Sequence, residues 1–223
     1  VKHGDAIIVF LHGGGYYFGS SLTTHRLGIA LLAKHTGITC HSIDYRLAPD
    51  YPYPAALDDA IIAYKDIINN YPTSRIIIAG DSAGGGLGLA LMMKLRDSNG
   101  RLPDEAVLFS PWSDLNCLGE SFDSKAKADP MFTPSMLRDC SHYYAPEGID
   151  MTHPYVSPAY GDFADLPRML IVCGGNEILL SDSEDLVGKA KAAGVDVEFA
   201  LWPNMFHDWW LFGRFIPETK QCL

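Results

Sequence analysis

The chain has 223 residues, of which 48% are hydrophobic, and a formal net charge of -10. This length suffices to bury one sizeable core, so we expect a single domain over residues 1–223. The acidic balance, with no cluster of Lys and Arg residues, excludes the phosphate-binding surface that nucleic-acid-binding proteins carry.

Short β-branched runs alternate with longer segments of helical period along the chain. This alternation predicts an α/β fold with a mostly parallel sheet and helices on both of its faces. The predicted strands are Ala6–Leu11, Ile38–Asp44, Arg75–Gly80, Ala106–Ser110, Arg168–Cys173 and Val195–Trp202. The predicted helices are Thr23–His35, Ala55–Asn70, Ala83–Asp97 and Leu179–Ala193.

A glycine-rich loop, His12-Gly13-Gly14-Gly15, follows the first predicted strand. Loops of this type donate backbone N–H groups to a tetrahedral oxyanion, and glycine is needed because the backbone itself must approach the substrate oxygen. His12 is expected to hold the loop rather than to act as a base. An ordinary Gly-rich turn is the alternative.

The third predicted strand leads into Gly80-Asp81-Ser82-Ala83-Gly84 and then into a helical segment rich in small residues. This is the G-x-S-x-G motif in the strand–turn–helix context of α/β-hydrolases, so Ser82 is the predicted nucleophile. Glycines two residues before and after the serine let the strand and the helix approach closely. A phosphate-binding turn is the alternative, but the chain contains neither G-x-x-x-x-G-K-[ST] nor G-x-G-x-x-G after a strand.

The stretch 112–166 is rich in proline and aromatic residues. It is too long for an ordinary connection between a strand and a helix, and long insertions of this kind are typically lids or binding loops. We therefore expect a cap insertion over the active site, with a surface excursion as the alternative. Its bulky residues would suit a closed acyl pocket: Trp112, Phe122, Met131, Phe132, Tyr143 and Tyr144.

Two later loops supply candidates for the rest of a catalytic triad. In α/β-hydrolases an acid and then a histidine follow the nucleophile along the chain, on loops after later strands. Glu177 follows the fifth predicted strand and His207 follows the sixth. Glu177 is thus the predicted acid, and His207 is the predicted general base.

These motifs together resemble the hormone-sensitive-lipase family of esterases, also called bacterial family IV. The glycine loop is similar to its oxyanion motif, residues 80–85 are similar to its serine motif, and Y-R-L-A-P at residues 45–49 looks like the family's signature segment. The resemblance implies oxyanion donors at Gly14, Gly15 and Ala83, with Gly13 shaping the loop.

The chain departs from the family pattern at two places near the triad. Aspartate is usual at the acid position, where this chain has Glu177, so the neighbouring Asp182 is a rival acid. The histidine is commonly followed by glycine, where this chain has Asp208, and we expect this change to alter the pocket wall more than the chemistry. The family also has strands and a cap before the glycine loop, so we expect N-terminal strands and a cap to be missing here.

The resemblance implies a serine carboxylesterase that hydrolyses short- to medium-chain acyl esters, as small-molecule substrates, through an acyl-enzyme intermediate. We expect no cofactor and no metal ion. An amidase or deacetylase with the same triad is the alternative among enzymes. A non-catalytic ligand-binding receptor on the same scaffold is the alternative from another class, although such receptors have lost the catalytic histidine.

The sequence also gives expectations for the cellular compartment, for membrane spans and for the oligomeric state. The five cysteines are odd in number, widely spaced and form no C-x-x-C pair, which favours a reducing compartment, and we expect the cytoplasm. The apolar runs are far shorter than the roughly 20 residues of a membrane span, so no span is expected. The last predicted strand would be a sheet edge, where the resemblance implies that two copies pair as a homodimer.

Overall fold

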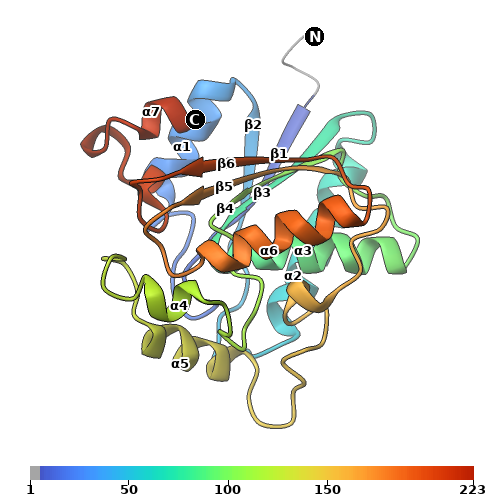
Figure 1. Ribbon diagram of the computed structural model, residues 1–223. Coiled ribbons are helices and arrows are strands. Elements are labelled where there is room, and N and C mark those ends of the chain that lie inside the picture. The colour runs from blue at the N-terminus through green and yellow to red at the C-terminus, as the bar shows by residue number, and fades with distance from the viewer. Residues whose placement is uncertain (1–5) are drawn as a thin grey trace.

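The computed structural model describes residues 6–223, and residues 1–5 of the expected domain lie outside the described part. Within it, six strands form one sheet in the order β2-β1-β3-β4-β5-β6, and every neighbouring pair is parallel (Figure 1). The strands are β1 (Ala6–Leu11), β2 (Thr39–Ile43), β3 (Arg75–Asp81), β4 (Glu105–Phe109), β5 (Arg168–Gly174) and β6 (Val197–Trp202). The predicted parallel α/β sheet is confirmed, and its strand ends differ from the predicted ones by at most two residues.

The four predicted helices are also present, with small shifts at their ends. They are α1 (Arg26–Thr36), α2 (Ala55–Asn70), α3 (Ser82–Asp97) and α6 (Leu180–Ala192). The 3₁₀ helix η3 (Trp209–Phe215) and the short α7 (Thr219–Cys222) follow the last strand. No helix within residues 6–223 is both long enough and apolar enough to cross a bilayer.

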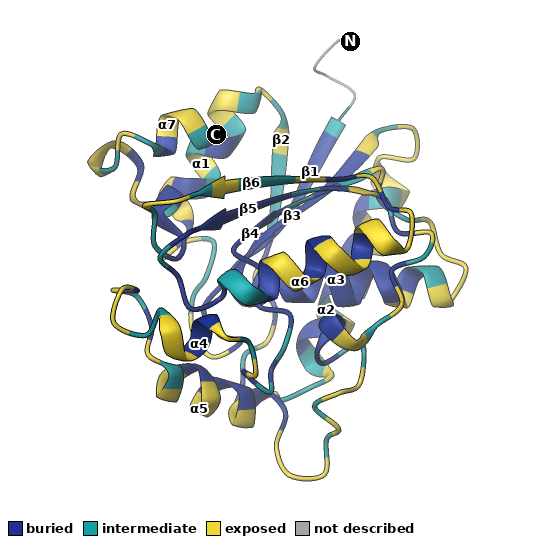
Figure 2. Cartoon of the chain, viewed as in Figure 1, coloured by how far each residue is buried: buried dark blue, intermediate teal, exposed yellow. Residues whose placement is uncertain are grey.

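Strand β1 shows why the sheet needs cover on both faces. The side chains of Ile7, Val9 and Leu11 join the apolar core against α2 and α3. Those of Ile8 and Phe10 point to the other face and pack with residues of α1 and η3. Because the buried side chains alternate between the two faces, a helix layer must lie on each side, and Figure 2 shows the central strands buried between these layers.

The segment 112–166 joins β4 to β5. It contains α4 (Ser121–Ser124), α5 (Pro134–Tyr144) and the 3₁₀ helix η2 (Pro158–Tyr160). Three of its bulky residues, Trp112, Phe122 and Tyr144, are fully buried in the apolar core shared with α2 and α3. Half of the six bulky residues expected at the acyl pocket therefore stabilise the fold of the segment instead.

Strands β2 and β6 are the two edges of this sheet. Strand β6 is less buried than its neighbour β5, since it contacts only one other strand. Pairing of two copies along β6 stays a prediction.

Candidate active site

The parallel register places the loops that follow neighbouring strands side by side. Leu11 at the end of β1 lies opposite Gly80 in β3, which brings the 12–15 loop next to the start of α3. Gly174 at the end of β5 lies opposite Trp202 at the end of β6, which brings the loops after these two strands together. All four segments thus meet at the carboxyl edge of the sheet, where open α/β folds bind ligands.

Ser82 lies on the sharp turn where β3 ends and α3 begins. Its φ of 51° falls in the left-handed region, which strains a residue that carries a Cβ. A Cβ on Gly80 would lie 2.6 Å from the carbonyl oxygen of Gly84, and a Cβ on Gly84 would collide with the carbonyl oxygen of Leu11. Glycine at these two positions lets α3 approach both β3 and the end of β1, so the spacing of the motif has a steric cause.

The loop after β1 presents backbone N–H groups that are free to bind an anion. Gly14 and Gly15 have φ values of 110° and 62°. Within residues 6–223 their N–H groups make no hydrogen bond, whereas the N–H of Gly13 donates to Oδ1 of Asp81 at 3.0 Å. The N–H of Ala83, in the first turn of α3, has no acceptor inside its own helix. Three donors are therefore available, and Gly13 is held in place by its own hydrogen bond.

His12 supports this loop, as predicted. Its ring stacks on Tyr45 with a centroid separation of 4.4 Å, and the Tyr45 hydroxyl donates to the His12 carbonyl oxygen at 2.6 Å. The Nδ1 of His12 lies 2.7 Å from the carbonyl oxygen of Gly13. These contacts occupy His12 with the backbone of the loop.

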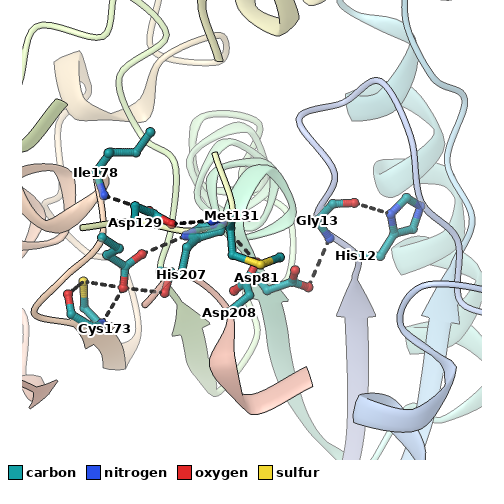
Figure 3. Close-up of polar contacts among 12 residues, drawn as sticks. His12, Gly13, Asp81, Asp129, Met131, Cys173, Ile178, His207 and Asp208 are labelled. Atoms are coloured by element: carbon teal, nitrogen blue, oxygen red, sulfur yellow. Dashed lines mark hydrogen bonds and ion pairs between the residues drawn. The ribbon is translucent and has the colours of Figure 1, made fainter. Parts of the chain in front are cut away.

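Glu177 and His207 form a buried pair in the loops after β5 and β6. The Nδ1 of His207 donates to Oε2 of Glu177 at 2.7 Å (Figure 3). The other oxygen, Oε1, accepts from Oγ of Ser110 at 2.9 Å, from Sγ of Cys173 at 3.1 Å and from the N–H of Gly174. Because Oε1 is fully engaged, Oε2 faces the imidazole and holds its proton on Nδ1, which leaves Nε2 for other chemistry.

The two loops are joined by their backbones as well. The N–H of Asn176 donates to the carbonyl oxygen of Met205 at 2.9 Å, and that of Gly175 donates to Trp202 at 2.8 Å. A Cβ on Gly175 would collide with the carbonyl oxygen of Pro203. Gly175, two residues before Glu177, thus allows the close approach of the two loops that brings the carboxylate and the imidazole into hydrogen-bond contact.

Asp182, the rival acid, is engaged elsewhere. Its Oδ2 accepts from the N–H groups of Ser113 and Asp114, both at 2.9 Å. Burial raises the pKa of Asp182 to about 7. The structure therefore brings Glu177, and not Asp182, to the imidazole of His207.

Ser82 and His207 are not hydrogen-bonded to each other. Oγ of Ser82 and Nε2 of His207 are both buried, and neither has a hydrogen-bond partner among the described residues. Their chain neighbours Asp81 and Asp208 line the same cavity. Catalytic hydrogen bonds are often long in unliganded enzymes and tighten when substrate binds.

Asp208 is a member of this site that sequence reasoning placed only in the pocket wall. Its Oδ2 lies 3.0 Å from Nε2 of His207, and its side chain is 6% exposed. Burial lowers the pKa of His207, but the charge of Asp208 and the hydrogen bond to Glu177 outweigh burial, so the pKa lies well above its usual value. The departure from the family's usual glycine was the signal at this position, and its effect reaches the imidazole itself.

A cavity of about 240 Å³ opens beside these groups. Most of its lining is apolar, and Asp208 and Asp81 contribute carboxylates to it. The ring of Phe132 lies edge-on to the imidazole of His207, with centroids 5.2 Å apart. A neighbouring groove of about 470 Å³, lined in part by Tyr143, shares Phe132 with the cavity. The segment 112–166 thus contributes directly to the space next to the imidazole.

The chain is similar to proteins of known class over nearly its whole length. A family model described as alpha/beta hydrolase fold matches residues 8–211. An acetyl-hydrolase of Streptomyces hygroscopicus is 39% identical over 218 residues, which cover 97% of this chain and 72% of that protein. An esterase of Acinetobacter venetianus is 36% identical over the same shares of the two chains. The crystal structure of the hormone-sensitive-lipase homologue EstE7, from a metagenome library, is 42% identical with a TM-score of 0.95 and covers 100% of this chain and 76% of its own.

Proposed function

The chain belongs to the alpha/beta hydrolase family, among the hormone-sensitive-lipase esterases, and we propose that it is a serine carboxylesterase acting through Ser82, His207 and Glu177. The observation that carries this proposal is the 2.7 Å hydrogen bond between His207 and Glu177, beside a serine on a strained strand-to-helix turn. The acid fixes the tautomer of the imidazole, and the turn places the hydroxyl at the N-terminus of α3, where negative charge is stabilised.

The proposed reaction is a two-step acyl transfer. Nε2 of His207 takes the proton of the Ser82 hydroxyl while Oγ attacks the ester carbonyl, and the imidazolium then protonates the departing alcohol. Water hydrolyses the acyl-enzyme by the same steps. Oγ and Nε2 have no hydrogen-bond partner among the described residues, so both remain available to each other when substrate binds.

The tetrahedral oxyanion is assigned to the N–H groups of Gly14, Gly15 and Ala83. The N–H groups of Gly14 and Gly15 make no hydrogen bond within the described residues, which supports this role. The N–H of Gly13, in contrast, already donates to Asp81. Preorganised donors of this kind each lower the barrier by about 3 kcal/mol. Gly13 contributes by fixing the conformation of the loop.

The proposed substrates are short- to medium-chain acyl esters, and residues 112–166 are the proposed cap. The cavity volume of about 240 Å³ is smaller than the roughly 300–1,000 Å³ of pockets that bind drug-sized ligands. Met131 and Phe132 of this segment line the cavity. The acetyl-hydrolase relative supports the short end of this range.

Two measurements test the proposal. A fluorophosphonate probe should label the wild-type protein at Ser82 and should not label Ser82→Ala, whereas a receptor on the same scaffold should not react. Rates on p-nitrophenyl esters should then fall as the acyl chain grows beyond medium length. A preference for long acyl chains would overturn the proposed substrate range. A wild-type protein that the probe does not label would overturn the proposed esterase function.

A further inference from the structure

The imidazole of His207 lies between two carboxylates. Oε2 of Glu177 is 2.7 Å from Nδ1, and Oδ2 of Asp208 is 3.0 Å from Nε2 (Figure 3). The side chains of His207 and Glu177 are fully buried, and that of Asp208 is 6% exposed. One carboxylate suffices to orient an imidazole, so the second carboxylate acts on the charge of the ring instead.

The contact with Asp208 is electrostatic rather than a directed hydrogen bond. Nε2 and Oδ2 are within ion-pair distance, but Nε2 has no hydrogen-bond partner among the described residues because the geometry is not aligned. Oδ2 of Asp208 therefore does not occupy the hydrogen-bonding position of Nε2. Asp208 acts on the charge of the imidazole without occupying the place of the nucleophile.

The backbone holds Asp208 in this position. Its φ and ψ of 52° and 32° are left-handed, a conformation that aspartate, asparagine and glycine tolerate better than other residues. The next two residues, Trp209 and Trp210, are fully buried in the core. The carboxylate is thus fixed between a left-handed turn and an anchored helix.

The charges around the pair are predominantly negative. Glu177 faces His207 from the loop after β5, and Asp81 faces Asp208 from the end of β3. Asp81 is already paired with His25, whose Nε2 lies 2.8 Å from its Oδ2. Burial raises the pKa of Asp208, and the charge of His207 opposes that rise. The imidazole of His25 also faces Asp208, whose charge helps to raise the pKa of His25. A proton on Nε2 of His207 is the charge within ion-pair distance of the Asp208 carboxylate, so the surroundings favour the imidazolium.

We propose that Asp208 is a positioning residue that keeps His207 protonated in the resting protein, so that ester hydrolysis begins only after that proton has left. This inference rests on the proposed role of His207 as general base. The proton on Nε2 passes to solvent water, and the neutral imidazole then takes the proton of Ser82 as Oγ bonds to the carbonyl carbon. Asp208 stabilises the imidazolium re-formed in that step, which later protonates the leaving alkoxide.

The test is the pH dependence of kcat/KM on p-nitrophenyl acetate. Asp208→Asn and Asp208→Gly both tolerate the left-handed turn and both remove the charge. In each variant the ascending limb should move to lower pH, so that kcat/KM near pH 5.5 rises about tenfold while the value near pH 9 changes less than about threefold. Asp196→Asn, which removes a carboxylate with a side chain 81% exposed, is the charge-matched control and should leave the profile unchanged.

A second measurement separates this inference from the proposed esterase. NMR titration of the His207 imidazole requires no activity, and it should show protonation persisting to higher pH in the wild-type protein than in Asp208→Asn. Equal titration in the two proteins, or a uniform loss of rate at every pH, would overturn the role of Asp208 while Ser82 labelling still supported the esterase. If the variants do not fold, an ordinary His207 titration in the wild type overturns the role alone. If the wild type hydrolyses no ester, the esterase proposal fails and the NMR comparison still decides the effect of Asp208.

Discussion

Replacing Glu177 with glutamine tests the proposed acid, because the surroundings of the carboxylate dictate how the amide must sit. Oε1 accepts from Ser110, Cys173 and Gly174, so the amide oxygen of the variant takes that position. The amide nitrogen then faces Nδ1 of His207, at a position now 2.7 Å from it. A donor there forces Nδ1 to accept, which moves the imidazole proton to Nε2, where the base must be free.

The expected loss in kcat is about 10³–10⁴-fold, equivalent to about 4–5 kcal/mol of barrier, because the wrong tautomer is enforced and the imidazolium loses its counter-charge. The measurement is kcat on p-nitrophenyl acetate for Glu177→Gln, with thermal unfolding to show that the variant is folded. Asp182→Asn, which keeps an acceptor oxygen for the backbone groups that Asp182 binds, should lose less than about tenfold. A folded Glu177→Gln with near wild-type kcat, or an equal collapse of Asp182→Asn, would refute the assignment of the acid.

Gly14→Ala should lower kcat about 100-fold and destabilise the fold, because the φ of Gly14 is 110° and a Cβ there would collide with a backbone carbonyl. Gly188→Ala in α6 is the control, because a Cβ there meets nothing within 4 Å. It should stabilise the fold by about 0.5–1 kcal/mol, as measured by thermal unfolding. Burial raises the pKa of Asp182 to about 7, so the folded state binds that proton more tightly and stability should fall as pH rises from about 4 to about 7. Asp182→Asn should flatten this dependence, and parallel melting-temperature curves for the two proteins would contradict it. Phe132→Ala removes a ring 5.2 Å from that of His207 and should shift the preferred p-nitrophenyl ester to a longer acyl chain; an unchanged chain-length profile would count against the cap.

Local pattern was sufficient to predict the sheet and the sharp turn at Ser82. The strand β1 was predicted at its observed bounds because six consecutive apolar residues suit a strand covered on both faces. Gly80 was predictable because its steric reason lies within the turn, where a Cβ would collide with Gly84. The reason for Gly84 lies instead in its close approach to Leu11 at the end of β1. The pairing of Glu177 with His207 agrees with the order of triad residues along the chain, since loops after adjacent parallel strands must meet.

Three features depend on the tertiary structure, and no local sequence pattern predicted them. Trp112, Phe122 and Tyr144 belong to the core, and not to a pocket, because residues 112–166 fold back onto α2 and α3. Whether Ser82 and His207 share a hydrogen bond depends on how the start of α3 and the loop after β6 are placed in space, and in this structure the bond is missing. Asp208 reaches the imidazole because a left-handed turn and two buried tryptophans fix the direction of its side chain. Its carboxylate lies 3.0 Å from a buried nitrogen, and the strength of this interaction depends on distance and burial. A linear sequence pattern encodes neither.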